Sequence, residues 1–409
     1  MRFNLRLLFL ALFVLFFLVA ILGGLLWANL NFVRSVPGGG DFYVLWKGGQ
    51  NFILSAAAPY QDLTKSLQGL VFGAGARPAG ETLRRLSLPL YVLLVFSPFI
   101  MIRDALLARA AWMVFLEVEL IGLVFLAVEL LHWKPGRLYI TLLVLFGVFW
   151  APAVVSLYSG SAIIFQAVLV IGALRALEFG ADELAGALLA LTWFNLEAVA
   201  PVVILILFWT LLSRRLRVWA GFLLATVILV GFSVFFSTTW LLAYLGAVLA
   251  NWNSNAAPTT YSLFTAWLPG IGLRIAQGVT LAALLILIAE WRAVRGKDLR
   301  WLLWTASLTI AVTPLLGMPF IPAWLVLSFP GLLLVLAIME QRWGTFGRWS
   351  ALALFCVVFF GLWAAFRANV GSVFVVFYPL MLIFLLYWVR WWAVRPPRLW
   401  ADIISDMGK

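Results

Sequence analysis

Charge, cysteine and histidine are scarce in this sequence. Charged residues make up 11% of the chain and hydrophobic residues 65%, whereas a soluble domain needs roughly 25% charged residues to cover its surface. A soluble fold is therefore excluded. Because Cys356 is the only cysteine, the chain forms no internal disulfide. With His132 as the only histidine, it also lacks a Cys or His cluster for the usual zinc sites. It contains no P-loop, GxSxG or HExxH motif and no GxGxxG after a strand, so no soluble-enzyme motif suggests a function.

Long apolar runs take the place of the missing charge. A spanning helix needs about 20 mostly apolar residues, and in lipid only helices and closed barrels satisfy every backbone hydrogen-bonding group. The runs here are unbroken, which excludes the alternating pattern of a membrane barrel. We therefore predict an all-α polytopic membrane protein with roughly 11–13 membrane segments. These segments form a single multi-span domain over residues 1–409.

Basic residues indicate how the chain is oriented. The net charge is +12, but the arginines and lysines fall in short clusters between apolar runs, as the positive-inside rule describes. The pattern argues against a nucleic-acid partner and predicts a multi-pass protein of the cell membrane, in a prokaryote the plasma membrane. The first span, residues 7–28, is predicted to be retained, with a cytoplasmic N-terminus. One conflict stays open, because a single apolar segment separates Arg103 and Arg109 from Lys134 and Arg137. One pair lies outside, or that segment is not a full span.

The first outer loop, residues 31–86, contains the stretch GGGDFYVLWKGGQNFILSAAAPY at positions 38–60. Its apolar residues recur at helical spacing with polar residues between them, which predicts a helix in the membrane interface. Asp41 stands at the start of this helix. Aspartate is a favoured N-cap residue, and it is also suited to act as a base that faces a cavity in the membrane. A second outer loop, residues 239–269, either covers a cavity or simply connects two spans.

Polar residues interrupt the apolar segment at 183–213. Asn195 and Glu197 lie near its middle, and irregular backbone inside a membrane persists only where it lines a cavity in the protein. We therefore predict a broken or re-entrant pair of helices here. Glu197 is expected to face a cavity or a partner, because a charge inside lipid is expensive. Arg175 and Glu178 are three residues apart and are expected to form an ion pair near a membrane face.

Five segments, taken in order, carry a resemblance to a known family. GGDFYVLWKGGQNFILSAAAPYQD has an aspartate, an aromatic pair, a short helix and Pro-Tyr, and LSLPLYVLLVFSPFIMI resembles a Tyr-Pro-Pro run with a later proline. LYSGSAIIFQAVLV stands where the family has Gly-Gln before an apolar run. The last two, ELAGALLALTWFNLEAVAPVVILILFWTLLSRR and TIAVTPLLGMPFIPAWLVLSFPGLLLVLA, resemble an Ala-Gly, Lys and Pro segment and a late Ser-Pro segment. The set resembles the integral-membrane GT-C glycosyltransferases, and most of all glycosyltransferase family 87, the polyprenol-phosphate-mannose-dependent mannosyltransferase group.

The resemblance implies a GT-C-like bundle and a hexosyltransferase of the cell envelope with its active site on the outer face. The implied donor is a polyprenyl-phosphate-linked sugar, a hexose or pentose with mannose favoured, and the implied acceptor is a lipid or glycan. In that superfamily the first-loop aspartate is the base that deprotonates the acceptor hydroxyl, a role that passes to Asp41. Basic residues or a divalent metal would stabilise the leaving phosphate, and no other cofactor is implied. The predicted substrate-binding residues are Lys47, Tyr60, Arg84, Arg85, Ser161, Asn195 and Glu197. The basic members of this set are equally suited to snorkel at the interface.

Two departures from the family pattern leave other functions open. Ser161 stands where the family has glutamine, and the usual lysine before Pro201 is replaced by a stretch that carries Asn195 and Glu197. A non-catalytic protein with the same fold is one alternative. The interrupted segment and the intramembrane glutamates also suit a transporter or lipid flippase. The sequence has no internal repeat of the kind that many transporters show.

Overall fold

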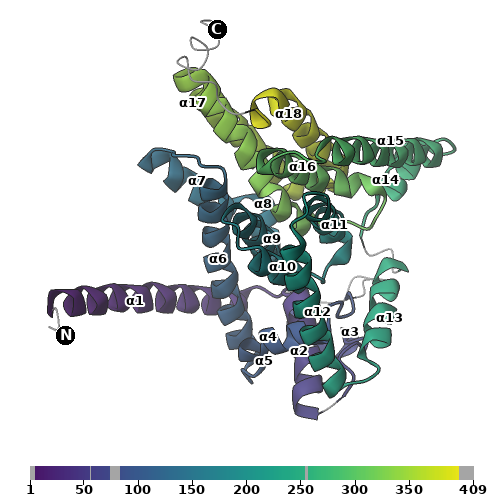
Figure 1. Cartoon of the computed structure of the whole chain (residues 1–409). Helices are drawn as coiled ribbons and strands as arrows, with labels where there is room; N and C mark the ends of the chain where they lie inside the picture. Colours follow the sequence, from purple (N-terminus) through teal and green to yellow (C-terminus); the bar gives the residue numbers. More distant parts are fainter. Residues whose placement is uncertain (1–4, 56, 74–82, 254–256, 396–409) are drawn as a thin grey trace, which may run out of the picture.

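The computed structural model describes residues 5–55, 57–73, 83–253 and 257–395, and within these ranges every regular element is a helix (Figure 1). In chain order the α-helices are α1 (Leu5–Ser35), α2 (Gly40–Ser55), α3 (Thr64–Phe72), α4 (Leu90–Val95), α5 (Ser97–Ile100), α6 (Ala105–Leu130), α7 (Arg137–Phe149), α8 (Ala151–Ser159), α9 (Ile163–Glu178), α10 (Asp182–Leu191), α11 (Leu196–Leu212), α12 (Leu216–Phe236), α13 (Trp240–Asn253), α14 (Thr260–Trp267), α15 (Gly272–Ala293), α16 (Leu299–Val312), α17 (Phe329–Arg367) and α18 (Tyr378–Ala393). Two 3-10 turns, Thr313–Leu316 and Pro322–Ser328, lie between α16 and α17, and a π-helical turn, Val373–Phe377, leads into α18.

Fewer helices can cross a membrane than the sequence predicts. Seven helical stretches in the described ranges are long and apolar enough to do so, or eight if the bent pair α7–α8 is counted as one span. The chain is thus a multi-pass membrane protein, and the predicted count of roughly 11–13 segments exceeds the number of such helices. Three of the extra segments form short helices: α9 has 16 residues, α10 has 10 and α11 has 17. Much of their surface is buried against other helices, because an all-round apolar run fits a protein interior as well as it fits lipid.

Helix α17 contains a reversal of the chain. Gly344 has non-helical backbone angles, with φ 56° and ψ −125°, in the middle of this 39-residue element. The Phe146 ring centroid lies 6.0 Å from that of Phe329 and 4.2 Å from that of Phe355. In a straight helix, Phe329 and Phe355 would be about 39 Å apart. The element is therefore a helical hairpin that turns at Gly344.

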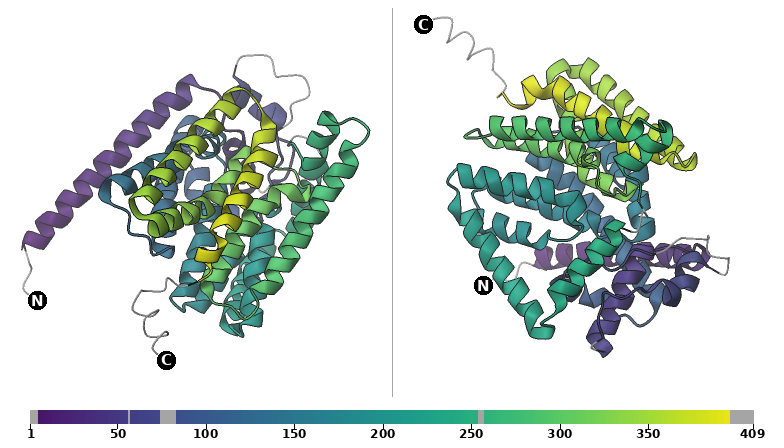
Figure 2. Two further views of the ribbon diagram at one scale, coloured as in Figure 1. Left: turned by 90° about the horizontal axis from the view of Figure 1, so that it is seen from above. Right: turned by 90° about the vertical axis from the view of Figure 1, so that its right-hand side faces the viewer.

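Helix α1 stands apart from the other helices over most of its length (Figures 1 and 2). Its spanning stretch is almost entirely exposed, as lipid contact requires of an apolar helix, and Trp27 is 70% exposed. The C-terminal part packs against α6, where the Asn29 amide nitrogen lies 3.1 Å from both carboxylate oxygens of Glu117. This contact gives one of the intramembrane glutamates a polar partner, as the energetics of lipid require.

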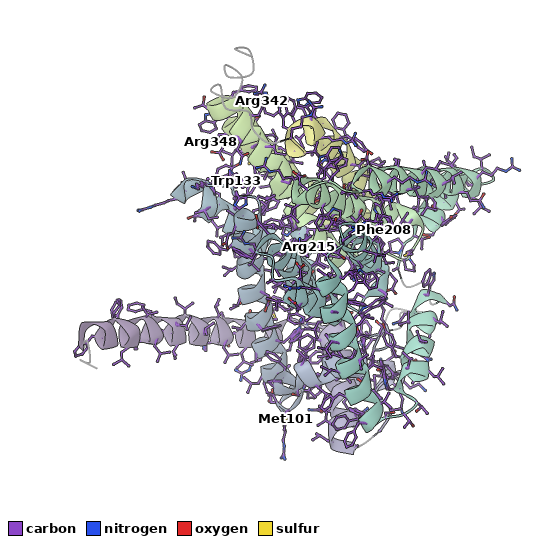
Figure 3. All side chains as sticks on the ribbon, viewed as in Figure 1. Met101, Trp133, Phe208, Arg215, Arg342 and Arg348 are labelled. Atoms are coloured by element: carbon purple, nitrogen blue, oxygen red, sulfur yellow. The ribbon has the colours of Figure 1, made fainter. Side chains whose placement is uncertain are left out.

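Ion pairs join the ends of several helices. The predicted pair Arg175–Glu178 is confirmed, and Arg175 also binds Glu129 at the end of α6. The Trp133 indole donates a hydrogen bond of 2.9 Å to Glu340, which also accepts one of 2.8 Å from Arg348. Trp133 and Arg348 are labelled in Figure 3. These contacts fix α9 to α6, and the α6–α7 turn to α17, at points where the chain leaves its apolar segments.

The two predicted outer loops contain helices that pack against protein. Helix α2 is buried from Phe42 to Trp46 and contacts α3, α5, α6 and α8. The expected interfacial helix is therefore largely enclosed, and its last turn, with Leu54 65% exposed, presents apolar surface. Residues 239–269 contain α13 and α14, so this segment is not a plain connector. Helices α2, α3 and α13 gather at the same end of the bundle (Figure 1).

Candidate functional site

A cavity of about 50 Å³ lies where five stretches of the chain meet. These are the start of α2, the segment 84–88 before α4, the turn between α8 and α9, the break before α11, and residues 321–324. A space of this size holds a few water molecules. Its polar lining consists of Asp41, Arg84, Arg85, Ser87, Ser161 and Asn195. Five of the predicted site residues thus line one cavity, and a sixth, Glu197, contacts it through Arg84.

Asp41 lies in the first turn of α2, one residue inside the helix rather than at its N-cap. The partial positive charge of a helix N-terminus stabilises a carboxylate at this position. Burial raises the pKa of the Asp41 carboxyl above its usual value, an effect that the nearby Arg84 charge and a hydrogen bond with the Ser159 hydroxyl partly offset. The result is a carboxylate that faces a cavity and binds protons more tightly than an ordinary aspartate.

Gly160 allows the turn between α8 and α9 to approach the start of α2. Its φ of +72° lies in the left-handed region, and a Cβ at this position would be 2.4 Å from the Cβ of Phe42. Glycine is the residue that adopts this backbone geometry without a steric penalty. The close approach places Ser159 and Ser161, on either side of Gly160, beside Asp41. The sequence showed the glycine but gave no reason to expect this contact.

Arg109 holds the chain that leads into α2. The residue is 1% exposed, and its two terminal nitrogens donate hydrogen bonds of 3.2 Å to the Val36 carbonyl and 3.1 Å to the Tyr158 carbonyl. The residue is therefore buried and structural, and its charge does not report which side of the membrane a loop occupies. Arg109 lies near the start of α6 and Lys134 follows its end, so the two residues stand at opposite ends of one helix. Because Arg109 is held by backbone carbonyls of the protein, the positive-inside rule does not require it to lie on the same side of the membrane as Lys134.

Arg84 and Glu197 form an ion pair at the edge of the cavity. The Nη2 atom of Arg84 lies 3.3 Å from Oε1 of Glu197, whose residue is 4% exposed. The guanidinium carbon of Arg84 lies 5.2 Å from the centroid of the Trp324 ring, a cation–π geometry. Glu197 was predicted to face a cavity or a partner, and the structure gives it a partner, Arg84, which lies 113 residues away in sequence.

Arg85 is held by its backbone. The Asn251 side chain accepts a 2.7 Å hydrogen bond from the Arg85 N–H and donates one of 2.8 Å to the Arg85 carbonyl. Asn251 belongs to α13 and is buried, so the second loop fixes part of the cavity wall. The Arg85 residue itself is exposed and lines the cavity. Sequence reasoning missed Asn251, because only the fold brings it beside Arg85.

The predicted break in the segment 183–213 is confirmed. Helix α10 ends at Leu191, α11 begins at Leu196, and Asn195 between them has a positive φ of 43°. The buried Gln166 amide donates hydrogen bonds to the Thr192 carbonyl, at 2.7 Å, and to the Phe194 carbonyl. Backbone carbonyls freed by the break are therefore satisfied within the protein, as they must be at membrane depth.

Lys47 and Tyr60, which the sequence also suggested, do not line the cavity. Lys47 is partly buried farther along α2. The Tyr60 hydroxyl donates a 3.1 Å hydrogen bond to the carbonyl of Leu88, a residue of the cavity wall, and burial raises the pKa of this hydroxyl. The structure therefore places Tyr60 behind the wall, where it supports Leu88.

Comparison with known proteins adds no family to these findings. No family model matches the chain, and neither a curated protein nor a solved structure matches it. The described part of the chain contains no group of three or more His, Cys, Asp or Glu side chains able to hold a metal ion. The fold establishes a helical multi-pass membrane protein, and the activity has to be argued from the chemistry of the cavity.

Proposed function

We propose that this protein is a GT-C-like membrane glycosyltransferase. It moves a hexose or pentose, with mannose favoured, from a polyprenyl-phosphate donor to a lipid or glycan acceptor of the cell envelope. The observation that carries the proposal is that one cavity collects a carboxylate with a raised pKa, Asp41, and two arginines, Arg84 and Arg85. A carboxylate base to accept a proton and cations to bind a phosphate are the two kinds of group that this transfer needs.

The carboxylate supplies the base. The acceptor hydroxyl passes its proton to Asp41 as its oxygen bonds to the anomeric carbon of the sugar, and the bond from that carbon to the phosphate oxygen breaks. The electron pair of the broken bond leaves on the polyprenyl phosphate, and Asp41 later releases the proton to water. Because a base with a raised pKa takes up a proton more readily, the burial of Asp41 supports this role.

The arginines supply the electrostatic stabilisation. Negative charge develops on the phosphate as it leaves, and guanidinium groups present rigid pairs of donors that suit phosphate oxygens. Arg84 and Arg85 lie in the same stretch of cavity wall. Ser161 and Asn195 add a hydroxyl and an amide to the lining, and we assign them to the hydroxyl groups of the sugar.

The proposal places the cavity on the outer face of the plasma membrane and the N-terminus in the cytoplasm, as the arginine clusters of the sequence indicate. The cavity in its present form is smaller than a sugar. Donor binding therefore requires the wall to open. The segment 84–88 is the longest continuous stretch of that wall outside a regular element in the described structure.

Transfer and transport can be separated in one experiment. The full chain is reconstituted in proteoliposomes with a polyprenyl-phosphate sugar, labelled in the sugar, and a lipid extract as acceptor. A panel of mannose, glucose and pentose donors identifies the sugar that is transferred. Label in a new glycolipid or glycan product supports the glycosyltransferase. Unaltered donor that has crossed the bilayer indicates a flippase, and the absence of any donor binding indicates a non-catalytic protein.

A further inference from the structure

The contact between Arg84 and Glu197 is loose for a buried ion pair. Its 3.3 Å separation is longer than the roughly 2.7–2.9 Å of a strong charge-assisted hydrogen bond. A guanidinium carries five N–H donors, and Glu197 receives the hydrogen bond that Arg84 donates within the described structure. The Arg84 side chain keeps 17% of its surface accessible, whereas that of Glu197 keeps 3%. Arg84 is therefore paired on one side, with further donors left for the cavity.

Two acidic and two basic side chains lie at the cavity. Asp41, Arg84 and Arg85 line it, and Glu197 pairs with Arg84 at its edge. Within the described residues, no carboxylate lies at ion-pair distance from Arg85. An incoming phosphate therefore meets one arginine that is available and one that is already paired with a carboxylate.

We infer that Glu197 is an internal counter-anion that competes with the phosphate of the ligand for Arg84. The ligand is a phosphate ester, and its arrival exchanges the Arg84–Glu197 contact for a contact between Arg84 and phosphate. The Trp324 ring, which lies 5.2 Å from the guanidinium carbon, keeps Arg84 at the cavity in both arrangements. The inference rests on the proposed function and adds to it a way of limiting phosphate affinity.

The exchange has a consequence for product release. A polyprenyl phosphate product carries more negative charge than the donor diester, so two unpaired arginines would hold it tightly. Glu197 opposes this by taking Arg84 back when the phosphate leaves. A carboxylate at this position thus lowers affinity for the phosphate group, and its removal is expected to raise that affinity.

Binding to the full chain in nanodiscs tests the inference. The probes are farnesyl phosphate, inorganic phosphate and the neutral alcohol farnesol, each titrated by calorimetry. For Glu197→Gln we expect farnesyl phosphate to bind roughly tenfold more tightly than to wild type, the equivalent of one charge-assisted contact no longer displaced. Farnesol binding should not change. Glu183→Gln is the matched control, because Glu183 is 62% exposed and pairs with Arg217 outside the cavity, and it should bind all three probes as wild type does.

A double-mutant cycle locates the effect at the pair. Arg84→Gln should weaken farnesyl phosphate binding, and Glu197→Gln should give no gain in the Arg84→Gln background. If Glu197→Gln does not yield folded protein, Glu197→Asp replaces it, because the shorter side chain withdraws the carboxylate from Arg84. We expect this variant also to bind farnesyl phosphate more tightly than wild type. Equal response to inorganic phosphate means that the site recognises phosphate alone, whereas a stronger response to farnesyl phosphate adds the lipid chain to the recognised ligand. Both results support the exchange.

Two results overturn it, and they are distinguishable. If wild type binds farnesyl phosphate but Glu197→Gln binds it equally or more weakly, the exchange is wrong while the proposed function stands. If wild type binds neither phosphate probe, the proposed function fails and the exchange fails with it.

Discussion

Adding one methyl group at Gly160 should displace the start of α2, and with it the cavity wall that carries Asp41. The new Cβ would stand 2.4 Å from the Cβ of Phe42, and carbon atoms pack at about 3.5–4.0 Å, so one backbone must move by about 1 Å. Overpacking of this kind costs about 1–3 kcal/mol, and the left-handed backbone adds about 1–2 kcal/mol for a residue other than glycine. Since Phe42 follows Asp41, the shift also moves the carboxylate, and a displacement of about 1 Å can lower a catalytic rate about 100-fold.

Gly180 provides the matched control. Its φ of +75° is close to the +72° of Gly160, but nothing lies within 4 Å of a Cβ at this position. Gly180→Ala therefore carries the backbone penalty alone. Thermal unfolding of the two variants, followed by sugar transfer from a polyprenyl-phosphate donor, should place Gly160→Ala below Gly180→Ala in both stability and rate. Equal stability and equal rate would show that the close approach of the α8–α9 turn to α2 is not as described.

Other changes probe the supports of the cavity and its protonation. Arg109→Gln leaves two backbone carbonyls without their donor. We therefore expect the free energy of unfolding, measured with denaturant, to fall by about 1–3 kcal/mol for each carbonyl. Arg103 is exposed, so Arg103→Gln is a control that should leave stability unchanged. Asn251→Ala removes both hydrogen bonds to the Arg85 backbone and should weaken farnesyl phosphate binding, and unaltered affinity would contradict the clamp. The raised pKa of Asp41 favours its neutral form in the folded state, so its ionisation lowers stability as the pH rises above about 3.9, the unfolded value. Asp41→Asn should therefore be at least as stable as wild type at neutral pH, and the transfer rate of wild type should fall as the pH drops through the raised pKa. A less stable Asp41→Asn protein would contradict the burial argument.

Local sequence patterns predicted the features that depend on neighbouring residues. Arg175 and Glu178 pair across three residues of one helix, and the break around Asn195 follows from polar residues inside an apolar run. Asp41 could be placed at the start of a helix because glycines precede it and apolar residues recur after it. In each case the physical cause lies within a few residues along the chain.

Contacts between distant segments could not be predicted in this way. Nothing in the first loop indicates that Arg84 meets Glu197, or that Asn251 holds Arg85, because those pairs form only when the helices pack. Arg109 was interpreted as a loop charge, although the fold buries it. The number of spans was overestimated for a related reason, since hydropathy does not distinguish a helix enclosed by protein from one that crosses lipid.

The most direct test of the central claim is sugar transfer by Asp41→Asn. Loss of a general base lowers a rate by about 10²–10⁴-fold, so the variant should form almost no labelled product from a polyprenyl-phosphate sugar that wild type uses. The variant should be no less stable in thermal unfolding and should bind farnesyl phosphate no more weakly than wild type, and the exposed Glu183→Gln variant should transfer at the wild-type rate. Transfer by folded Asp41→Asn at the wild-type rate would contradict the account of the cavity as a glycosyltransferase site with Asp41 as its base.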